Sequence, residues 1–356
     1  MKLERDRWRE VMSLFDAVPQ DRPDIQARLS DLSSTIFVEG DDSATMALLV
    51  PEPGVVGLMA GSPNAEGLRQ VWQEGKGMIT ELALPDQTWV QVFGEAFGFE
   101  FCRRPRVTFA WKPQALTDQA LALGATAAQV ERIDRKWIDA VCAIEPDFWD
   151  SYADGESFLR QGFGFCAIEH GAAVSACWST FPPVDSLLDI SVATRREWRK
   201  RGLALAVCNA LLRECVERQI TPFWTTDGWN LASQHLAGKL GFVEAQRHFW
   251  MSHTPWNAGK KRVAVDAKLI AEYAGHYGDA GKVIRIVQDG AALVFHDDLG
   301  QKLEMVAETA TRFFLTQVPI EIEFGRGASG FVSGFLRRQG GKEWWMGKLD
   351  DAPRPA

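Results

Sequence analysis

A predicted strand, a basic turn and a predicted helix follow one another in one short segment, and their order constrains the fold most. The apolar run from Leu187 to Val192 is typical of a buried strand. An Ala- and Leu-rich stretch from about Leu203 to Gln219 predicts a helix, and the basic segment Arg195 to Arg201, followed by Gly202, lies between the two. Because the first N–H groups of a helix lack backbone partners and carry partial positive charge, this turn is suited to hold a phosphate group.

Two motifs in this region resemble those of the GNAT acyl-CoA transferases. The turn Arg199 to Ala204 reads RKRGLA and is similar to the R/Q-x-x-G-x-G/A signature of that family. Farther along, Trp229 to Ser233 and Gly238 to Phe242 resemble the family's N-x-x-A/S helix and the K-L-G-F start of its next strand. Short basic glycine turns are common, but both motifs in this order favour the family over a Rossmann-like strand, turn and helix.

Composition places the chain among globular proteins and argues against several partners. The 356 residues predict two or three domains, and 46% hydrophobic with 24% charged residues is ordinary for a globular fold. The net charge of −8 argues against nucleic acid as a partner, because that binding depends on neutralising phosphates. No long apolar run predicts a membrane span, and the charged N-terminus has no signal-peptide core. Six cysteines without a C-x-x-C pair predict free thiols, a cytoplasmic location and no metal site.

Residues 1–112 are predicted to be a degenerate copy of the domain that carries the two motifs. The sequence Gly98-Phe99 and the apolar strand after it parallel Gly241-Phe242 and its strand, but the first half has no R-x-x-G-x-A turn. We therefore expect a GNAT-like half without its own cofactor site, with chance similarity as the alternative. The catalytic GNAT domain is predicted at residues 113–258. The predicted elements of residues 1–258 are helices at 3–18, 24–33, 63–72, 128–142 and 147–159, and strands at 35–39, 44–50, 55–60, 106–111, 163–169, 172–180 and 222–226.

Closely spaced strands after residue 262 predict a third domain at residues 262–352. Seven or eight short antiparallel strands favour a small barrel or sandwich, and we expect its interior to be filled by side chains. Glu272 to Tyr277 and Thr311 to Phe314 resemble the lipocalin-like tail domain of some β-lactamase-related serine hydrolases, without a catalytic residue. The predicted fold class is thus an α/β (α+β) GNAT fold with tandem GNAT-like halves, plus a C-terminal antiparallel β-barrel-like domain.

The resemblance implies acetyl-CoA (coenzyme A) as cofactor and assigns residues to its parts. The backbone N–H of Val192 would bond the acyl carbonyl, and Thr194 would pair with the pantetheine arm. Asn230 and Ser233 would reach the pantetheine, although helix capping is an alternative role for both. The backbone of the turn would hold the pyrophosphate; its residues are Arg199, Lys200, Arg201, Gly202, Leu203 and Ala204.

The acid and the base of the reaction are left open by the sequence. Many GNAT enzymes have a tyrosine near the helix end that protonates the leaving thiolate, but this chain has Ala237 there. Water or Ser233 would then supply the proton. Asp189 is the first candidate for the base, directly or through water, and Asp185 and Asp227 are the alternatives.

These features predict an acyl-CoA-dependent N-acyltransferase, with acetyl transfer to a primary amine of a small molecule or peptide by direct attack. The alternative is a catalytically weak CoA-binding sensor or interaction protein. A serine hydrolase is disfavoured because no G-x-S-x-G motif is present, nor an S-x-x-K at an apolar helix start. The acceptor and the oligomeric state, including a homo-oligomer, are not fixed by the sequence.

Overall fold

The chain divides into two compact units, each built from two separate stretches. In this computed structural model the described residues are 1–17, 34–40, 44–50, 56–112, 129–145, 152, 154–184, 186–279, 282–296 and 302–349. The first unit comprises Met1–Trp89 and Pro105–Trp250, and the second comprises Val90–Arg104 and Met251–Ala356. These two units do not test the predicted division into three domains, which stays a prediction. No helix in the described part of the chain combines the length and the apolar character needed to cross a membrane.

The sheet of the first unit has twelve strands, contributed by two halves of the chain. The first half contains β1 (Lys2–Leu3), η1 (Arg5–Glu10), η2 (Met12–Ala17), β2 (Thr35–Val38), β3 (Met46–Val50), β4 (Val56–Gly61), α2 (Ala65–Gly75), β5 (Glu81–Ala83), α3 (Thr88–Phe97), η3 (Gly98–Glu100) and β6 (Phe101–Trp111). The second half contains β7 (Gln129–Arg132), α5 (Ile138–Cys142), α6 (Gly155–Gln161), β8 (Gly164–Glu169), β9 (Ala172–Ser179), β10 (Leu187–Thr194), η6 (Arg196–Trp198), α7 (Leu203–Glu217), β11 (Thr221–Asp227), α8 (Leu231–Lys239) and β12 (Phe242–His253).

The two halves repeat one order of elements, which confirms the predicted tandem arrangement. In each half a first strand, β1 or β7, is followed by three consecutive antiparallel strands, β2–β3–β4 and β8–β9–β10. A helix then leads to a strand parallel to the third one, so that β5 pairs with β4 and β11 pairs with β10. A second helix and a last strand complete each half.

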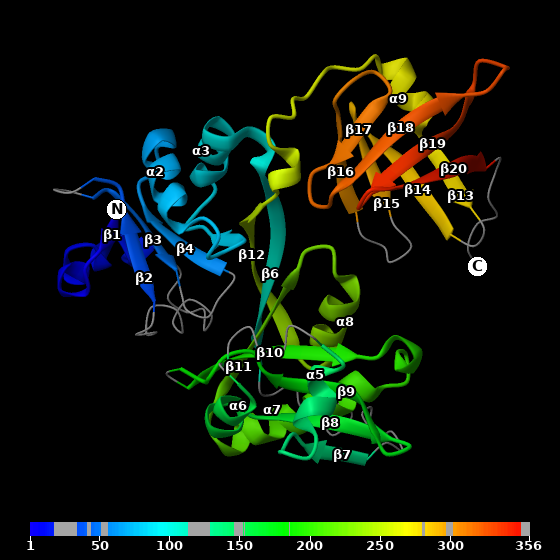
Figure 1. Cartoon of the computed structure of the whole chain (residues 1–356). Coiled ribbons are helices and arrows are strands. Elements are labelled where there is room, and N and C mark those ends of the chain that lie inside the picture. Colours follow the sequence, from blue (N-terminus) through cyan, green and yellow to red (C-terminus); the bar gives the residue numbers. More distant parts are fainter. Residues whose placement is uncertain are drawn as a thin grey trace. The chain divides into compact units, whose positions relative to one another are not determined.

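The last strands of the halves are exchanged. The order β4-β5-β12-β6-β11-β10 places β12 of the second half beside β5 of the first, and β6 of the first half beside β11 of the second. Figure 1 shows β6 and β12 as long neighbouring strands. Arg106 on β6 stands opposite Asp227 on β11, and its Nη1 donates to the Asp227 carboxylate at 2.8 Å. Neither half completes its sheet without a strand of the other.

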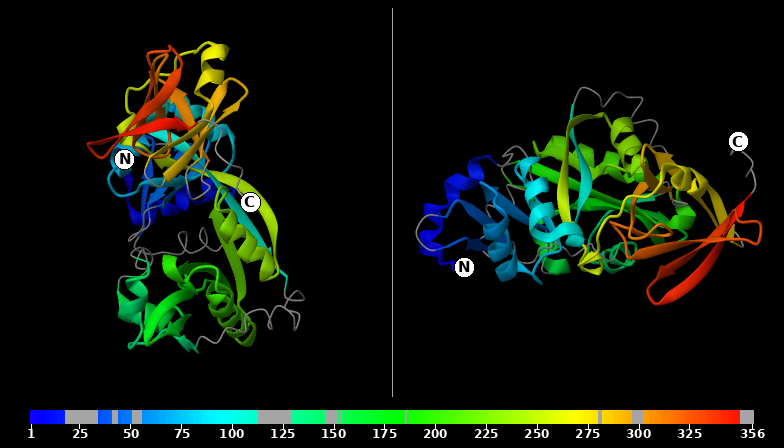
Figure 2. Two further views of the ribbon diagram at one scale, coloured as in Figure 1. Left: turned by 90° about the vertical axis from the view of Figure 1, so that its right-hand side faces the viewer. Right: turned by 90° about the horizontal axis from the view of Figure 1, so that it is seen from above.

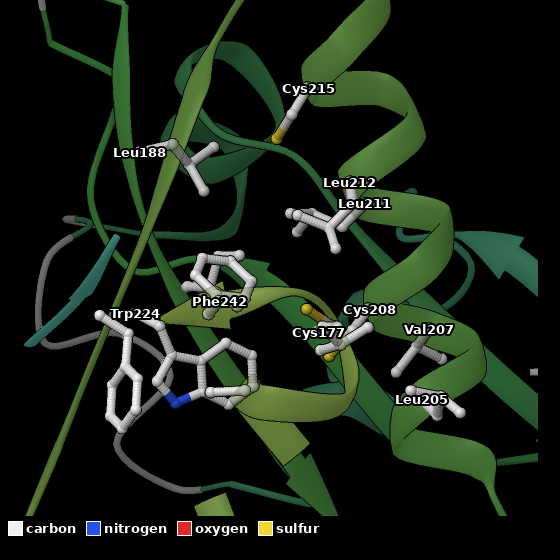
Figure 3. Packing of buried hydrophobic residues seen from close by; sticks show 14 of the residues in the cluster. Cys177, Leu188, Leu205, Val207, Cys208, Leu211, Leu212, Cys215, Trp224 and Phe242 are labelled. Atoms are coloured by element: carbon white, nitrogen blue, oxygen red, sulfur yellow. The ribbon is translucent and has the colours of Figure 1, made fainter. Parts of the chain in front are cut away.

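A hydrophobic core packs α7 and the end of α8 against the sheet of the second half. Leu188, Trp224 and Phe242 contribute from the strands, and Figure 3 shows them facing the α7 side chains. Cys177 and Cys208 lie next to each other in this core. Burial and the neighbouring Cys208 raise the pKa of the Cys177 thiol well above its usual value. The thiol therefore stays protonated near neutral pH, as a structural role requires.

The structure differs from the sequence prediction at residues 128–142 and 3–18. The expected helix over 128–142 is a strand, β7, followed by a turn and the short helix α5. Residues Gln129–Arg132 pair with the open edge of β8, which outweighs the helical spacing of the apolar side chains. The expected helix over 3–18 is instead the strand β1 followed by two 3₁₀ helices. The helix predicted at 24–33 lies outside the described residues. The helix predicted at 147–159 also begins outside them and overlaps α6, which runs from Gly155 to Gln161.

The second unit contains a closed eight-stranded antiparallel barrel, as the sequence predicted. Its elements are η7 (Pro255–Asn257), α9 (Ala267–Tyr273), β13 (Gly275–Asp279), β14 (Lys282–Asp289), β15 (Ala292–His296), β16 (Lys302–Ala307), β17 (Arg312–Leu315), β18 (Ile320–Arg326), β19 (Val332–Gln339) and β20 (Lys342–Leu349). Figure 2 shows the barrel strands from two further directions. Aromatic side chains pack its core, where Tyr273 stacks on Phe324 with ring centroids 3.8 Å apart.

We expect the stability of the first unit to depend measurably on the Arg106–Asp227 ion pair, which joins the exchanged strand β6 to β11. Replacing Arg106 by Met keeps the aliphatic stem but leaves the Asp227 carboxylate, whose side chain is 17% exposed, without this cation. We expect a loss of about 2–3 kcal/mol in the free energy of unfolding, measured by urea denaturation. The control is Arg69→Ala, which breaks an exposed pair with Glu66 and should cost less than about 0.5 kcal/mol. Equal shifts in the two variants would show that the pair does not stabilise the exchanged strand.

Candidate active site

The parallel strands β10 and β11 separate soon after they begin to pair. Their register covers only Leu187–Asp189 on β10 and Thr221–Phe223 on β11. From Phe223 to Asp227, β11 pairs with β6 on its other edge and has no further register with β10. From Ile190 to Thr194, β10 keeps only β9 as a neighbour. The edge of β10 that faced β11 is therefore no longer covered by that strand.

The backbone N–H groups of Val192 and Thr194 are directed at this uncovered edge. In an antiparallel ladder, alternate residues direct their N–H and C=O groups at the same neighbouring strand. Arg195 N–H donates to Val174 O at 2.9 Å, so the odd-numbered residues of β10 face β9 in the regular register. The even-numbered residues face the other way. Consistently, Thr194 O accepts a hydrogen bond from Arg199 Nε at 3.2 Å.

The helix α7, which follows this edge, starts without a side-chain cap. Gly202 is its N-cap residue and has no side chain that could accept a hydrogen bond. By contrast, the starts of α2, α6, α8 and α9 are each capped by a side chain; the capping residues are Asn64, Asp154, Asn230 and Asp266. The first N–H groups of α7 are thus left for a ligand or solvent.

The turn before α7 has a strained backbone and a concentration of positive charge. Lys200 has φ 62° and Gly202 has φ 79°, both in the left-handed region, which only glycine adopts without strain. Strain of this kind at a non-glycine residue is typical of functional sites. Within the described residues, none of the five cations between residues 195 and 201 pairs with a carboxylate. Arg201 lies over the Trp198 ring, 4.6 Å from its centroid.

In the first half, a side-chain cap and a carboxylate lie at the start of the equivalent helix, α2. Asn64 Oδ1 accepts from Gly67 N–H at the start of α2, and Asn64 Nδ2 donates to the Glu39 carboxylate at 2.9 Å. A Cβ added at Gly67 would collide with Glu39 Oε2, so this carboxylate lies directly against the helix start. The start of α2 thus has a side-chain cap and a carboxylate packed beside it, whereas α7 has no side-chain cap; the absence of a cofactor site in the first half stays a prediction.

Asn230 and Ser233 have structural contacts of their own. Asn230 Oδ1 caps α8 by accepting from Ser233 N–H at 3.1 Å, which is the alternative role considered for it. Ser233 Oγ accepts from Trp224 Nε1 at 2.9 Å, and Trp224 is only 1% exposed. The hydrogen of the Ser233 hydroxyl remains to donate to a ligand.

The candidates for the base are dispersed. Asp189 lies on the opposite face of β10 from Ile190 and Val192, whose side chains join the α7 core. Asp227 is ion-paired with Arg106, and Asp185 lies outside the described residues.

The position of the missing tyrosine lies in the core. Ala237 on α8 is fully buried and offers no proton donor. Across the described part of the chain, no three His, Cys, Asp or Glu side chains form a group that could hold a metal ion.

Two contacts at the site were not foreseen from the sequence. The Arg106–Asp227 pair joins residues 121 positions apart, and the Trp224–Ser233 bond joins β11 to α8. Neither contact is marked by a sequence motif, since both depend on which elements become neighbours in the fold. The separated strands β10 and β11 beside an uncapped, basic helix start leave backbone N–H groups and cations together at one edge of the sheet.

Comparison with known proteins identifies the family. A profile described as GNAT acetyltransferase matches residues 14–248, more than half of the chain, and the chain therefore belongs to the GNAT acetyltransferase family. It is 30% identical over 156 residues to the uncharacterized N-acetyltransferase YdfB of Bacillus subtilis (strain 168), which covers 44% of this chain and 59% of that relative. A GCN5-related N-acetyltransferase-like protein from Streptococcus suis 89/1591 shares the fold, with a TM-score of 0.58 at 24% identity over 69% of this chain and 98% of that one. The resemblance to GNAT enzymes seen in the sequence is confirmed.

We expect the Trp224–Ser233 hydrogen bond to stabilise the fold around the candidate site. Ser233→Ala leaves the buried Trp224 N–H without an acceptor, which should cost about 1–2 kcal/mol of stability. The change is measured by urea denaturation. Ser233→Thr keeps the hydroxyl and is the matched control, with an expected loss below that of the alanine variant. Equal losses would contradict a role for the hydrogen bond.

Proposed function

We propose that the chain transfers an acetyl group from acetyl-CoA to a primary amine of a small molecule or peptide, by direct attack of the amine. The observation that carries the proposal is the uncapped start of α7, with its left-handed, basic turn, next to the outward-directed N–H of Val192. Membership of the GNAT acetyltransferase family supports the same reaction.

The residues present fit coenzyme A. The N–H groups from Arg199 to Ala204 and the unpaired cations of the turn suit a pyrophosphate, which carries negative charge and many acceptor oxygens. The pantetheine arm would hydrogen-bond the backbone of Thr194 as an added strand would. The Arg199 guanidinium, which donates to the Thr194 carbonyl, would have to move away. Asn230 and Ser233 would contact the same arm from α8.

A backbone N–H group would polarise the acyl carbonyl. Bound acetyl-CoA supplies a thioester, and the Val192 N–H would donate to its carbonyl oxygen, where negative charge develops during attack. Asp189 is proposed to accept the proton of the amine, directly or through water, with Asp227 as the alternative. Ser233 or water would protonate the leaving sulfur, because Ala237 cannot.

A CoA-binding sensor with little turnover is the second candidate, and the buried Ala237 favours it. Release of free thiol from acetyl-CoA in the presence of primary amines separates an enzyme from a sensor. A cytoplasmic location is proposed from the six cysteines, none of which forms a disulfide. The barrel is proposed to be a lipocalin-like accessory domain, with domains at 1–112, 113–258 and 262–352.

Titration of CoA by calorimetry tests the cofactor site. Wild type should bind one CoA per chain, because in the first half the equivalent helix start is capped by Asn64, with Glu39 packed beside it. Gly202→Glu adds a side chain and a negative charge where the pyrophosphate would lie, and we expect at least hundredfold weaker binding.

The control for this titration is Gly77→Glu. Gly77 also has a positive φ, 87°, and a Cβ there meets no atom within 4 Å, so the substitution brings comparable backbone strain away from the site. Its affinity for CoA should equal that of the wild type. Unchanged affinity in Gly202→Glu would remove the proposed site, and a stoichiometry of two would contradict the role assigned to Glu39.

A further inference from the structure

The basic turn before α7 contains a tryptophan that the proposed acetyl transfer does not use. Trp198 lies on η6, shortly before Gly202, the N-cap residue of α7. Its ring is partly buried and packs against the hydrophobic core that contains the α7 side chains. The His170 ring, from the hairpin of β8 and β9, contacts it with ring centroids 5.9 Å apart. The indole of Trp198 is therefore held in place by two neighbouring parts of the fold.

The guanidinium of Arg201 differs from those of Arg195 and Arg199 in what it contacts. Arg195 and Arg199 each donate through Nε to a backbone carbonyl, at 3.1 and 3.2 Å. The Arg201 guanidinium instead lies over the Trp198 ring, 4.6 Å from its centroid. Toward the described residues, its side chain donates no hydrogen bond and forms no ion pair. Its N–H groups are thus available to a ligand.

The position of Arg201 suits the recognition of a phosphate group. It directly precedes the uncapped start of α7 and is exposed to solvent. It stands between Lys200 and Gly202, both with positive φ, and this turn brings its side chain back over Trp198. A guanidinium here adds its charge to that of the first N–H groups of the helix, and its planar fork matches two phosphate oxygens.

The contact with a fixed aromatic ring reduces what the Arg201 side chain loses on binding. A free arginine side chain samples many rotamers, and that freedom is lost when a phosphate holds it. Because the ring face attracts the cation, the Arg201 side chain samples fewer rotamers before the ligand arrives. The attraction uses no hydrogen-bond acceptor, so the N–H groups can still donate to phosphate oxygens.

We propose that Trp198 is a positioning residue that orders Arg201 for a phosphate group of coenzyme A. Trp198 acts on the cofactor through Arg201 and lies outside the R-x-x-G-x-A signature, which begins at Arg199. This inference rests on the cofactor site proposed above and adds a residue that the signature does not include.

The test is a double-mutant cycle measured by calorimetric titration of CoA into the full chain. Trp198→Leu keeps an apolar side chain for the core and should weaken binding about fivefold, because Arg201 is no longer ordered. Arg201→Gln should weaken it about tenfold through loss of the charge. The double variant should match Arg201→Gln within about twofold, since Trp198 then has no cation to order. Trp198→Phe keeps an aromatic face and should stay within about twofold of the wild type.

Trp8 provides the matched control. Arg5 lies over the Trp8 ring, 5.2 Å from its centroid, and Trp8 Nε1 donates to Leu3 O of β1, the edge strand of the first half. Trp8→Leu removes the same kind of pair and should leave the affinity for CoA unchanged.

Two results would overturn the role of Trp198 while leaving the cofactor site intact. One is losses that multiply in the double variant, which would show that Trp198 and Arg201 act independently. The other is equal weakening by Trp198→Leu and Trp8→Leu, which would show a general effect of removing a tryptophan. A wild-type chain that binds no CoA would be a different result, because it would overturn the proposed cofactor site and this inference together.

Discussion

The candidate site depends on the pairing of β11 with β6, a strand from the other half of the chain. A strand with neither edge paired would lose all of its backbone ladder hydrogen bonds. Over Phe223–Asp227, β6 pairs with the edge of β11 that faces away from β10, so this part of β11 keeps one strand neighbour after it separates from β10. The facing edge of β10 at Val192 and Thr194 is then not covered by β11. The first half, whose own helix α2 is capped by Asn64, thus completes the sheet that carries the site.

Local signals made much of the fold predictable. Apolar runs bounded by turn residues predicted the strands of the barrel and those at 163–169 and 172–180, which form a hairpin through His170 and Gly171, both with positive φ. The segment 128–142 was misjudged, because apolar residues at helical spacing also suit an edge strand followed by a turn and a short helix. The exchange of β6 and β12 could not be predicted, since it is decided by which strand edges meet far apart in the sequence.

The features of the candidate site also separate into those that the sequence could indicate and those that it could not. The turn Arg199 to Ala204 and the N–H of Val192 were named from the resemblance of a contiguous motif to the GNAT family, and the structure has the turn at the uncapped start of α7 and Val192 at the open edge of β10. The partners of Asp227 and Ser233 were not predictable, because Arg106 and Trp224 reach them only after strands and helix have packed. One sequence therefore named residues for a cofactor site, which stay a prediction, while the acceptor side stayed open.

Residue-resolved amide hydrogen exchange with and without CoA tests the central claim most directly. CoA should slow exchange at Val192 and Thr194, which face the open edge, and at Leu203 at the uncapped start of α7. Ser191 and Ala193 should change little, because their N–H groups already face β9. No slowing at Val192 and Leu203, or slowing at the start of α2 instead, would contradict the account.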